Sequence, residues 1–214
     1  MRLFFSSWLA LITLQLPAQI NDSPVGLAHY VFSSFTEGTV MLRSGEQSTQ
    51  QLNYNLVTKE MIFDQAGTYL AIAHPEEVDT VMIQGRRFVP VNHAFYECLG
   101  GAVYPFFVEH TCTIREQGAS TGFGNTNTTA ATSIKSLQTD GGAYKLKLPD
   151  QFQVIPGHTF YILRDGKYNR VANEQQLAKI FPKQKQVIRD WVKKNHTVFS
   201  KQADMVSLIM ALQQ

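Results

Sequence analysis

A series of short β segments with very short connections, between residues 25 and 115, restricts the fold of this 214-residue chain more than any other feature. In the segment QQLNYNLV, leucine and tyrosine alternate with asparagine, which is the period of a half-buried strand. Strands so closely joined must pair in antiparallel fashion, because a parallel crossover needs about a dozen residues or more. We predict an antiparallel β meander of about seven or eight strands, curled into a sandwich or a partial barrel. Turn residues separate the strands at Ser44-Gly45, Gln65–Gly67, Gln84-Gly85 and Gly100-Gly101.

Residues 117–142 interrupt this pattern, because Gly, Ser, Thr, Asn and Gln dominate them and predict a loop. Strands return in AYKLKLP and in HTFYILRDGKYNRVAN, where Asp165-Gly166 is the favoured pair for a two-residue hairpin turn. After Asn173, which can cap a helix, apolar residues recur at helical spacing in three short segments. We therefore predict an α+β fold, with a β-hairpin and a short C-terminal helical cap. The expected buried faces are Leu177, Ile180 and Phe181; Val187, Ile188, Trp191 and Val192; and Met205, Leu208, Ile209 and Leu212, with Ser200 capping the third helix.

The N-terminus, MRLFFSSWLALITLQLPAQ, has the layout of a secretory signal peptide. Arg2 precedes an apolar stretch over Leu3–Leu16, and Pro17-Ala18 supplies a cleavage point. This stretch is short for a spanning helix, although an uncut N-terminal anchor is the alternative. We expect an exported protein that is periplasmic, associated with the outer membrane, or extracellular. The predicted divisions are a signal peptide at 1–18, a β region at 19–116, the loop at 117–142, and a hairpin with three basic helices at 143–214.

Charge is distributed unevenly, although the whole chain carries only +2. The segment Arg164–Lys201 holds ten basic and three acidic residues, whereas the rest of the chain is acidic overall. Such an asymmetry indicates contact with an anionic surface or, in the simpler interpretation, the solvated faces of helices. We expect an envelope protein or an anionic surface as partner, and no nucleic acid, because no zinc-finger, helix-turn-helix or RNP pattern occurs. No later stretch reaches the ~18 apolar residues of a spanning helix, so we expect no transmembrane segment in the mature chain.

A serine in the loop fits the letters of a nucleophile elbow, because Gly118–Gly122 spells G-x-S-x-G around Ser120. That motif requires a strand, a strained turn and an immediate helix, but a polar tract without helical period follows Thr121. Asp150 and His158 follow Ser120 in the chain order of a Ser–Asp–His triad, but this order is the only observation that supports such a triad. The nearby GFGNTN lacks the third glycine and the lysine of phosphate-binding loops. We therefore predict no catalytic residue and no cofactor here.

Four potential zinc ligands, His93, Cys98, His110 and Cys112, lie within one short stretch. Their spacing does not match the close pairs typical of tetrahedral zinc sites, so we predict no metal site. Cys98 and Cys112 form an even set, which favours a disulfide in an oxidising compartment. The alternative is two unlinked thiols that pack as small apolar groups.

Several segments together resemble an uncharacterised exported protein family of Bacteroidetes. They are LNYN, FYE, the polar loop, YKLKLP, DGK, and the lysine-rich stretch that ends in DWVKKN. The resemblance extends over about residues 36–212. It implies export and a shared architecture, and it provides no catalytic residues to transfer.

The leading functional hypothesis is an exported envelope protein that has no catalytic activity and acts through surface interactions. The carboxylates Glu76, Glu77 and Asp79 lie in one turn, whereas a glycosidase pair lies across a cleft. An envelope hydrolase or carbohydrate-acting enzyme with a site on loops is one alternative. A small-ligand or lipid carrier is another. An enzyme predicts a deep pocket with converging ionisable groups, and a carrier predicts an apolar cavity inside the sheet.

Overall fold

The computed structural model describes residues 27–116, 129–131 and 152–213. These residues form one 11-stranded sheet in the order β11-β10-β8-β7-β6-β5-β1-β2-β3-β4, with β9 also paired to β8. Every pairing is antiparallel, so the predicted antiparallel sheet with C-terminal helices is confirmed. The order is not that of a simple meander, because β5 pairs with β1 and not with β4. The strands are β1 (Thr36–Leu42), β2 (Gln47–Tyr54), β3 (Met61–Gln65), β4 (Thr68–Ala71), β5 (Val78–Ile83), β6 (Arg86–Val91), β7 (Ala94–Gly100), β8 (Phe106–Glu116), β9 (Thr129–Ala131), β10 (Phe152–Arg164) and β11 (Lys167–Val171).

The described strands form one open sheet, which ends at β4 and β11, rather than the two sheets of a sandwich. The sheet curls, and its inner face buries a cluster that draws side chains from β1, β2, β3, β5, β6 and β7. Tyr54 of β2 and Phe88 of β6 stack in this cluster with ring centroids 6.0 Å apart. Burial of this apolar area is the main force that holds the curl.

The tight hairpins follow the expected turn chemistry. At the β10–β11 turn, Asp165 and Gly166 have φ angles of 52° and 69°. Positive φ at both central residues is the geometry that matches the twist of the flanking strands. Gln84 and Gly85 adopt the same conformation between β5 and β6. The predicted turns at these two positions are confirmed.

The alternation expected for QQLNYNLV is only partly correct. β2 ends at Tyr54, because the Asn55 side-chain oxygen accepts hydrogen bonds from the backbone N–H groups of Val57 and Thr58 and forms a turn. Asn53 is buried rather than solvent-facing, since its side chain bonds both the N–H and the carbonyl of Phe32. The segment before β1 therefore covers the polar face of β2.

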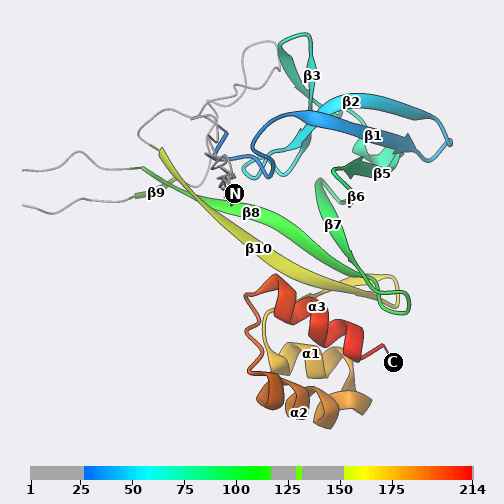
Figure 1. Ribbon diagram of the computed structural model, residues 1–214, viewed down its shortest axis with the longest axis vertical. Helices are drawn as coiled ribbons and strands as arrows, with labels where there is room; N and C mark the ends of the chain where they lie inside the picture. The colour runs from blue at the N-terminus through cyan, green and yellow to red at the C-terminus, as the bar shows by residue number, and fades with distance from the viewer. Residues whose placement is uncertain (1–26, 117–128, 132–151, 214) are drawn as a thin grey trace, which may run out of the picture.

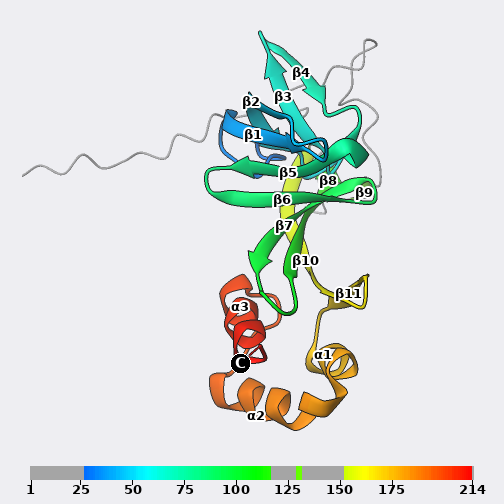
Figure 2. The same cartoon turned by 90° about the vertical axis from the view of Figure 1, so that its right-hand side faces the viewer.

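The helices gather at one end of the molecule, next to the long strands β8 and β10, while β1–β6 occupy the other end (Figures 1 and 2). They are α1 (Glu174–Ile180), the 3₁₀ turn η3 (Pro182–Gln184), α2 (Lys185–Asn195) and α3 (Gln202–Ala211); a further 3₁₀ turn, η1 (Pro75–Glu77), precedes β5. Leu177, Ile188 and Met205, one from each helix, are fully buried against strand residues such as Phe106 and Phe160. No helix of the described residues is long and apolar enough to cross a membrane.

Two details of the helices differ from expectation. Val187 is 56% exposed, because α2 packs through Ile188, Trp191 and Val192 and leaves Val187 at the edge of that face. The third helix begins at Gln202 after Lys201, so Ser200 is not its cap. Asn173 does cap α1, since its side-chain oxygen accepts a hydrogen bond from the N–H of Gln176.

Candidate functional site

Seven of the ten basic residues of the segment 164–201 lie on the helices or next to them, and Arg164, Lys167 and Arg170 lie on the β10–β11 hairpin. Nine of the ten are exposed, and Arg164 is half-buried. The helices are amphipathic: their apolar stripes enter the core, so their lysines and arginines remain in water. The nine exposed residues are Lys167, Arg170, Lys179, Lys183, Lys185, Arg189, Lys193, Lys194 and Lys201.

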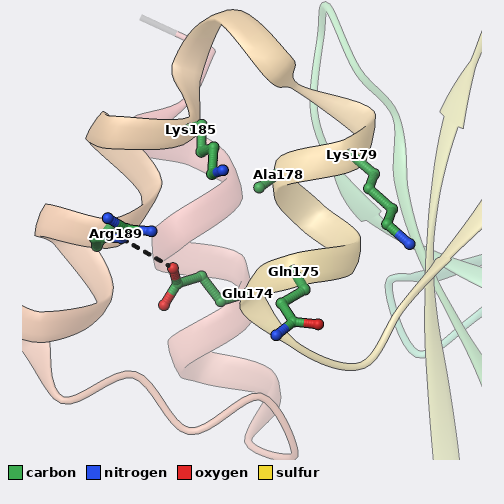
Figure 3. A pocket seen from close by; sticks show the side chains of 6 residues that line it. All are labelled: Glu174, Gln175, Ala178, Lys179, Lys185 and Arg189. Carbon is green, nitrogen blue, oxygen red and sulfur yellow. Dashed lines mark ion pairs between the residues drawn. The ribbon is translucent and has the colours of Figure 1, made fainter.

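Three of these cations line a pocket of about 360 Å³ between α1 and α2, here called the interhelical pocket. In Figure 3, Lys185 extends from α2 toward α1, and Lys179 leaves α1 on its other side. Arg189 forms an ion pair with Glu174, with Nε and Oε1 3.7 Å apart. In the part of the chain that the structure describes, no carboxylate pairs with Lys179 or Lys185, so the pocket keeps a positive charge. Its lining is Glu174, Gln175, Ala178, Lys179, Lys185 and Arg189.

A second pocket, of about 320 Å³, lies where the β7–β8 loop meets η3, and is called the Arg164 pocket. The guanidinium of Arg164 lies over the rings of Tyr104 and Phe181, 5.5 and 5.1 Å from their centroids. It also donates a hydrogen bond to the carbonyl of Ile180. These contacts fix its orientation, so its remaining donors are held in place. The lining is Tyr104, Arg164, Phe181, Pro182, Lys183 and Gln184.

A smaller apolar pocket, of about 220 Å³, lies against β1, β2 and β3. Val40, Leu52 and Phe63 form part of its wall. Ligand pockets are usually about 300–1,000 Å³, so this one is below the size that a lipid or a similar ligand needs. It gives the carrier hypothesis no specific support.

The sequence did not reveal a buried ionic network on β6, β7 and β8. Glu97 receives two hydrogen bonds from Arg86, at 2.7 and 2.6 Å, and its Oε2 lies 2.6 Å from Nε2 of His110. Burial on its own raises the pKa of Glu97, but the hydrogen bonds from Arg86 and His110 outweigh burial and lower that pKa to about 2. Arg86, Glu97 and His110 each have a hydrogen-bond partner within the network, which is the pattern of a structural network.

A second ion pair joins the turn after β2 to β8. Lys59 lies 2.6 Å from Oε1 of Glu109, and the Tyr161 hydroxyl donates to Oε2 of the same carboxylate at 3.0 Å. Glu109 is almost fully buried. Alternating polar residues in a strand are the only sequence signal for such pairs, and they do not identify the partners.

The residues named as potential catalytic or metal-binding groups do not form a site in the described residues. Ser120 and Asp150 lie outside these residues, and His158 bonds the carbonyl of Ser200. No group of three or more potential metal ligands comes together among the described His, Cys, Asp and Glu residues. Glu76 and Glu77 lie in η1, where Glu76 pairs with His74. Asp79 is an exposed residue of β5.

The two cysteines are free thiols in different parts of the sheet. Cys98 pairs with Phe107 across β7 and β8, and Cys112 follows Phe107 by five positions on β8. An odd separation places the two side chains on opposite faces of the sheet. Cys98 packs with Tyr96 and Phe107, and Cys112 packs against the inner cluster. The described arrangement is that of two unlinked thiols.

Comparison of the chain with protein-family models, with curated proteins and with solved structures finds no match. The resemblance to an exported Bacteroidetes family therefore stays a prediction. In the part of the chain that the structure describes, the two basic pockets at the helical end are the hollows lined by several cationic or fixed polar groups.

Proposed function

We propose that this protein is exported and acts without catalysis, through a basic surface on its C-terminal helices that binds an anionic partner. The N-terminal signal-like segment supports export. The charge of the segment 164–201 supports an anionic partner, because nine of its ten cations reach solvent.

The observation that carries the proposal is the concave arrangement of these cations. Solvated lysines on an ordinary helix point into open water, each apart from the others. Here Lys185 and Arg189 of α2 face α1 across one pocket that Lys179 also borders, and among its lining residues only Glu174 carries a negative charge. Like charges gathered around a hollow repel one another, and a bound anion would relieve that repulsion.

The buried network around Glu97 supports a structural rather than a catalytic interpretation of the sheet. Its ionisable groups are paired to each other and largely removed from solvent. A general acid or base needs a free position toward a substrate. The basic helical end is open to solvent, and we place the function there.

A binding experiment tests the proposal. Purified protein is applied to immobilised polyphosphate, and retention is measured as the salt concentration rises. Retention should fall sharply between about 0.02 and 0.15 M salt, because screening shortens the range of charge interactions. Salt-independent retention, or none at low salt, would contradict the proposal.

A further inference from the structure

The two basic pockets are neighbours in the chain. Lys183 and Gln184 line the Arg164 pocket, and the next residue, Lys185, lines the interhelical pocket. The Cα atoms of Lys183 and Lys185 are at most about 7 Å apart, since two trans peptide units span no more. Both lysines are exposed. The boundary between the pockets is therefore the segment 183–185, and it is itself basic.

The pockets differ in how they can hold an anion. The guanidinium of Arg164, which is planar, is held in orientation because it lies over the rings of Tyr104 and Phe181 and donates a hydrogen bond to the Ile180 carbonyl. A fixed guanidinium recognises an oxyanion by paired hydrogen bonds. Asp165, whose Oδ2 lies 3.6 Å from Nε of Arg164 and whose side chain is 89% exposed, is the carboxylate with which a ligand would compete. The interhelical pocket instead offers the flexible ammonium group of Lys185, which extends from α2 toward α1, while Lys179 only borders the pocket because its side chain leaves α1 on the other side.

We propose that the two pockets hold successive anionic groups of one linear polyanion, which passes over the segment 183–185. The Arg164 pocket binds one oxyanion through its guanidinium, and the interhelical pocket binds another by charge. This inference rests on the proposed function and names its ligand class: a chain that carries repeated phosphate or carboxylate groups. Two linked weak sites give one strong site, because the second binding event is intramolecular.

The shape of the surface favours a linear polyanion over a membrane as the ligand. A helix that lies on a lipid surface presents a continuous apolar face beside its cations. The buried faces of α1, α2 and α3 point into the core. The exposed large apolar residues of the described chain lie one each on the β7–β8 loop, α2, the α2–α3 connection and α3, so no helix presents a stripe of them: Val103, Val187, Val198 and Met210. The cations meanwhile border two hollows, of about 360 and 320 Å³, which admit groups that project from a chain.

Two pairs of lysines on the same helical end give a test with equal change of charge. In Lys183→Gln/Lys185→Gln both substitutions fall at the boundary of the pockets, whereas in Lys193→Gln/Lys194→Gln both fall at the far end of α2. All four residues are exposed, so both variants should fold. With long-chain polyphosphate as the probe, the first variant should lose at least about tenfold in affinity, and the second less than about threefold. Equal losses would overturn the inference and indicate a diffuse charge effect.

A charge-conserving substitution tests the Arg164 pocket. Arg164→Lys keeps the charge but removes the planar fork, so affinity should fall by about fivefold or more. The thermal midpoint is measured alongside, because the guanidinium also packs on two rings. Unchanged affinity in a folded variant would overturn the role of this pocket, and the lysine pairs keep the inference testable if the variant unfolds.

The source of the anionic groups is distinguished by parallel arms. Polyphosphate and polygalacturonate carry phosphate and carboxylate groups on a chain, and tight binding of either one supports the inference. Vesicles of phosphatidylglycerol present phosphate on a surface, and preferential binding to them would overturn it. If the protein binds but the pocket substitutions do not change its affinity, only this inference is refuted. If no probe binds, the proposed function is refuted as well.

Discussion

The hydroxyl of Tyr54 donates a 3.3 Å hydrogen bond to the main-chain carbonyl of His110, although four strands separate β2 from β8 in the sheet. The ion pair of Lys59 with Glu109 makes a second bridge between the same parts of the chain. Strands so far apart in a flat sheet could not touch. The curl of the sheet therefore brings β2 and its following turn onto β8, where the pairing of β8 with β7 has ended at Val108.

Replacing Tyr54 by Phe should lower the free energy of unfolding by about 1 kcal/mol, because the partly buried hydrogen bond to the carbonyl of His110 is lost. The ring and its stacking on Phe88 remain. Urea unfolding at neutral pH measures the change. Tyr69→Phe, on the edge strand β4, is the matched control, since no hydrogen bond of its hydroxyl occurs within the described residues, and it should be nearly neutral. Equal effects of both substitutions would contradict a specific bridge.

Replacing Glu97 by Gln should remove part of the acid sensitivity of the fold. In the folded protein the pKa of Glu97 lies at about 2, below the ordinary value of 4.5. A lowered carboxyl pKa contributes stability above pH 4.5, and this contribution is lost as the pH falls toward 2. Unfolding free energies measured between pH 2 and 5 should therefore slope less in the variant than in the natural protein. At pH 7 the variant should be less stable by about 3 kcal/mol, because Arg86 loses its charged partner. Parallel slopes would contradict the assignment.

Local features of this fold could be predicted from the sequence because neighbouring residues decide them. Asp165-Gly166 can reach the backbone angles of a tight hairpin with little strain, and Asn173 can cap a helix wherever one follows. The apolar stripe of α3, which includes Leu208 and Leu212, was likewise predicted from the helical spacing of its apolar residues.

Features that depend on register could not be predicted in this way. Arg86, Glu97 and His110 come from three strands, and nothing near any one of them specifies the other two. Asn53 looked solvent-facing because of its type, but a segment about twenty residues earlier satisfies its amide. The two basic pockets share this origin: the helical period predicted exposed lysines, while the packing of α1 against α2 decided which of them meet.

The cysteines should titrate as two free thiols when the protein is unfolded without reductant. In the folded state Cys112 should react slowly with a thiol reagent, because burial raises its pKa to about 11, and the opposing effect of Lys59 is smaller. Reaction rates with Cys98→Ser and Cys112→Ser distinguish the two sites. Finding no thiol in unfolded, unreduced protein would show that Cys98 and Cys112 form the disulfide that export favours, and would require the strands to shift.

Acid should destabilise the protein through His29 at a higher pH than through Glu97. The His29 side chain is fully buried, neither ring nitrogen has a hydrogen-bond partner among the described residues, and burial lowers its pKa to about 4. Because the folded pKa lies below the ordinary value of 6.5, the stability is complete above pH 6.5 and declines as the pH falls toward 4, by roughly 3 kcal/mol at most. His29→Gln, compared with the exposed control His74→Gln, should flatten the unfolding free energy between pH 6.5 and 4. A slope that persists in His29→Gln would show that another group takes up the proton, and a slope lost in His74→Gln would assign it to the surface.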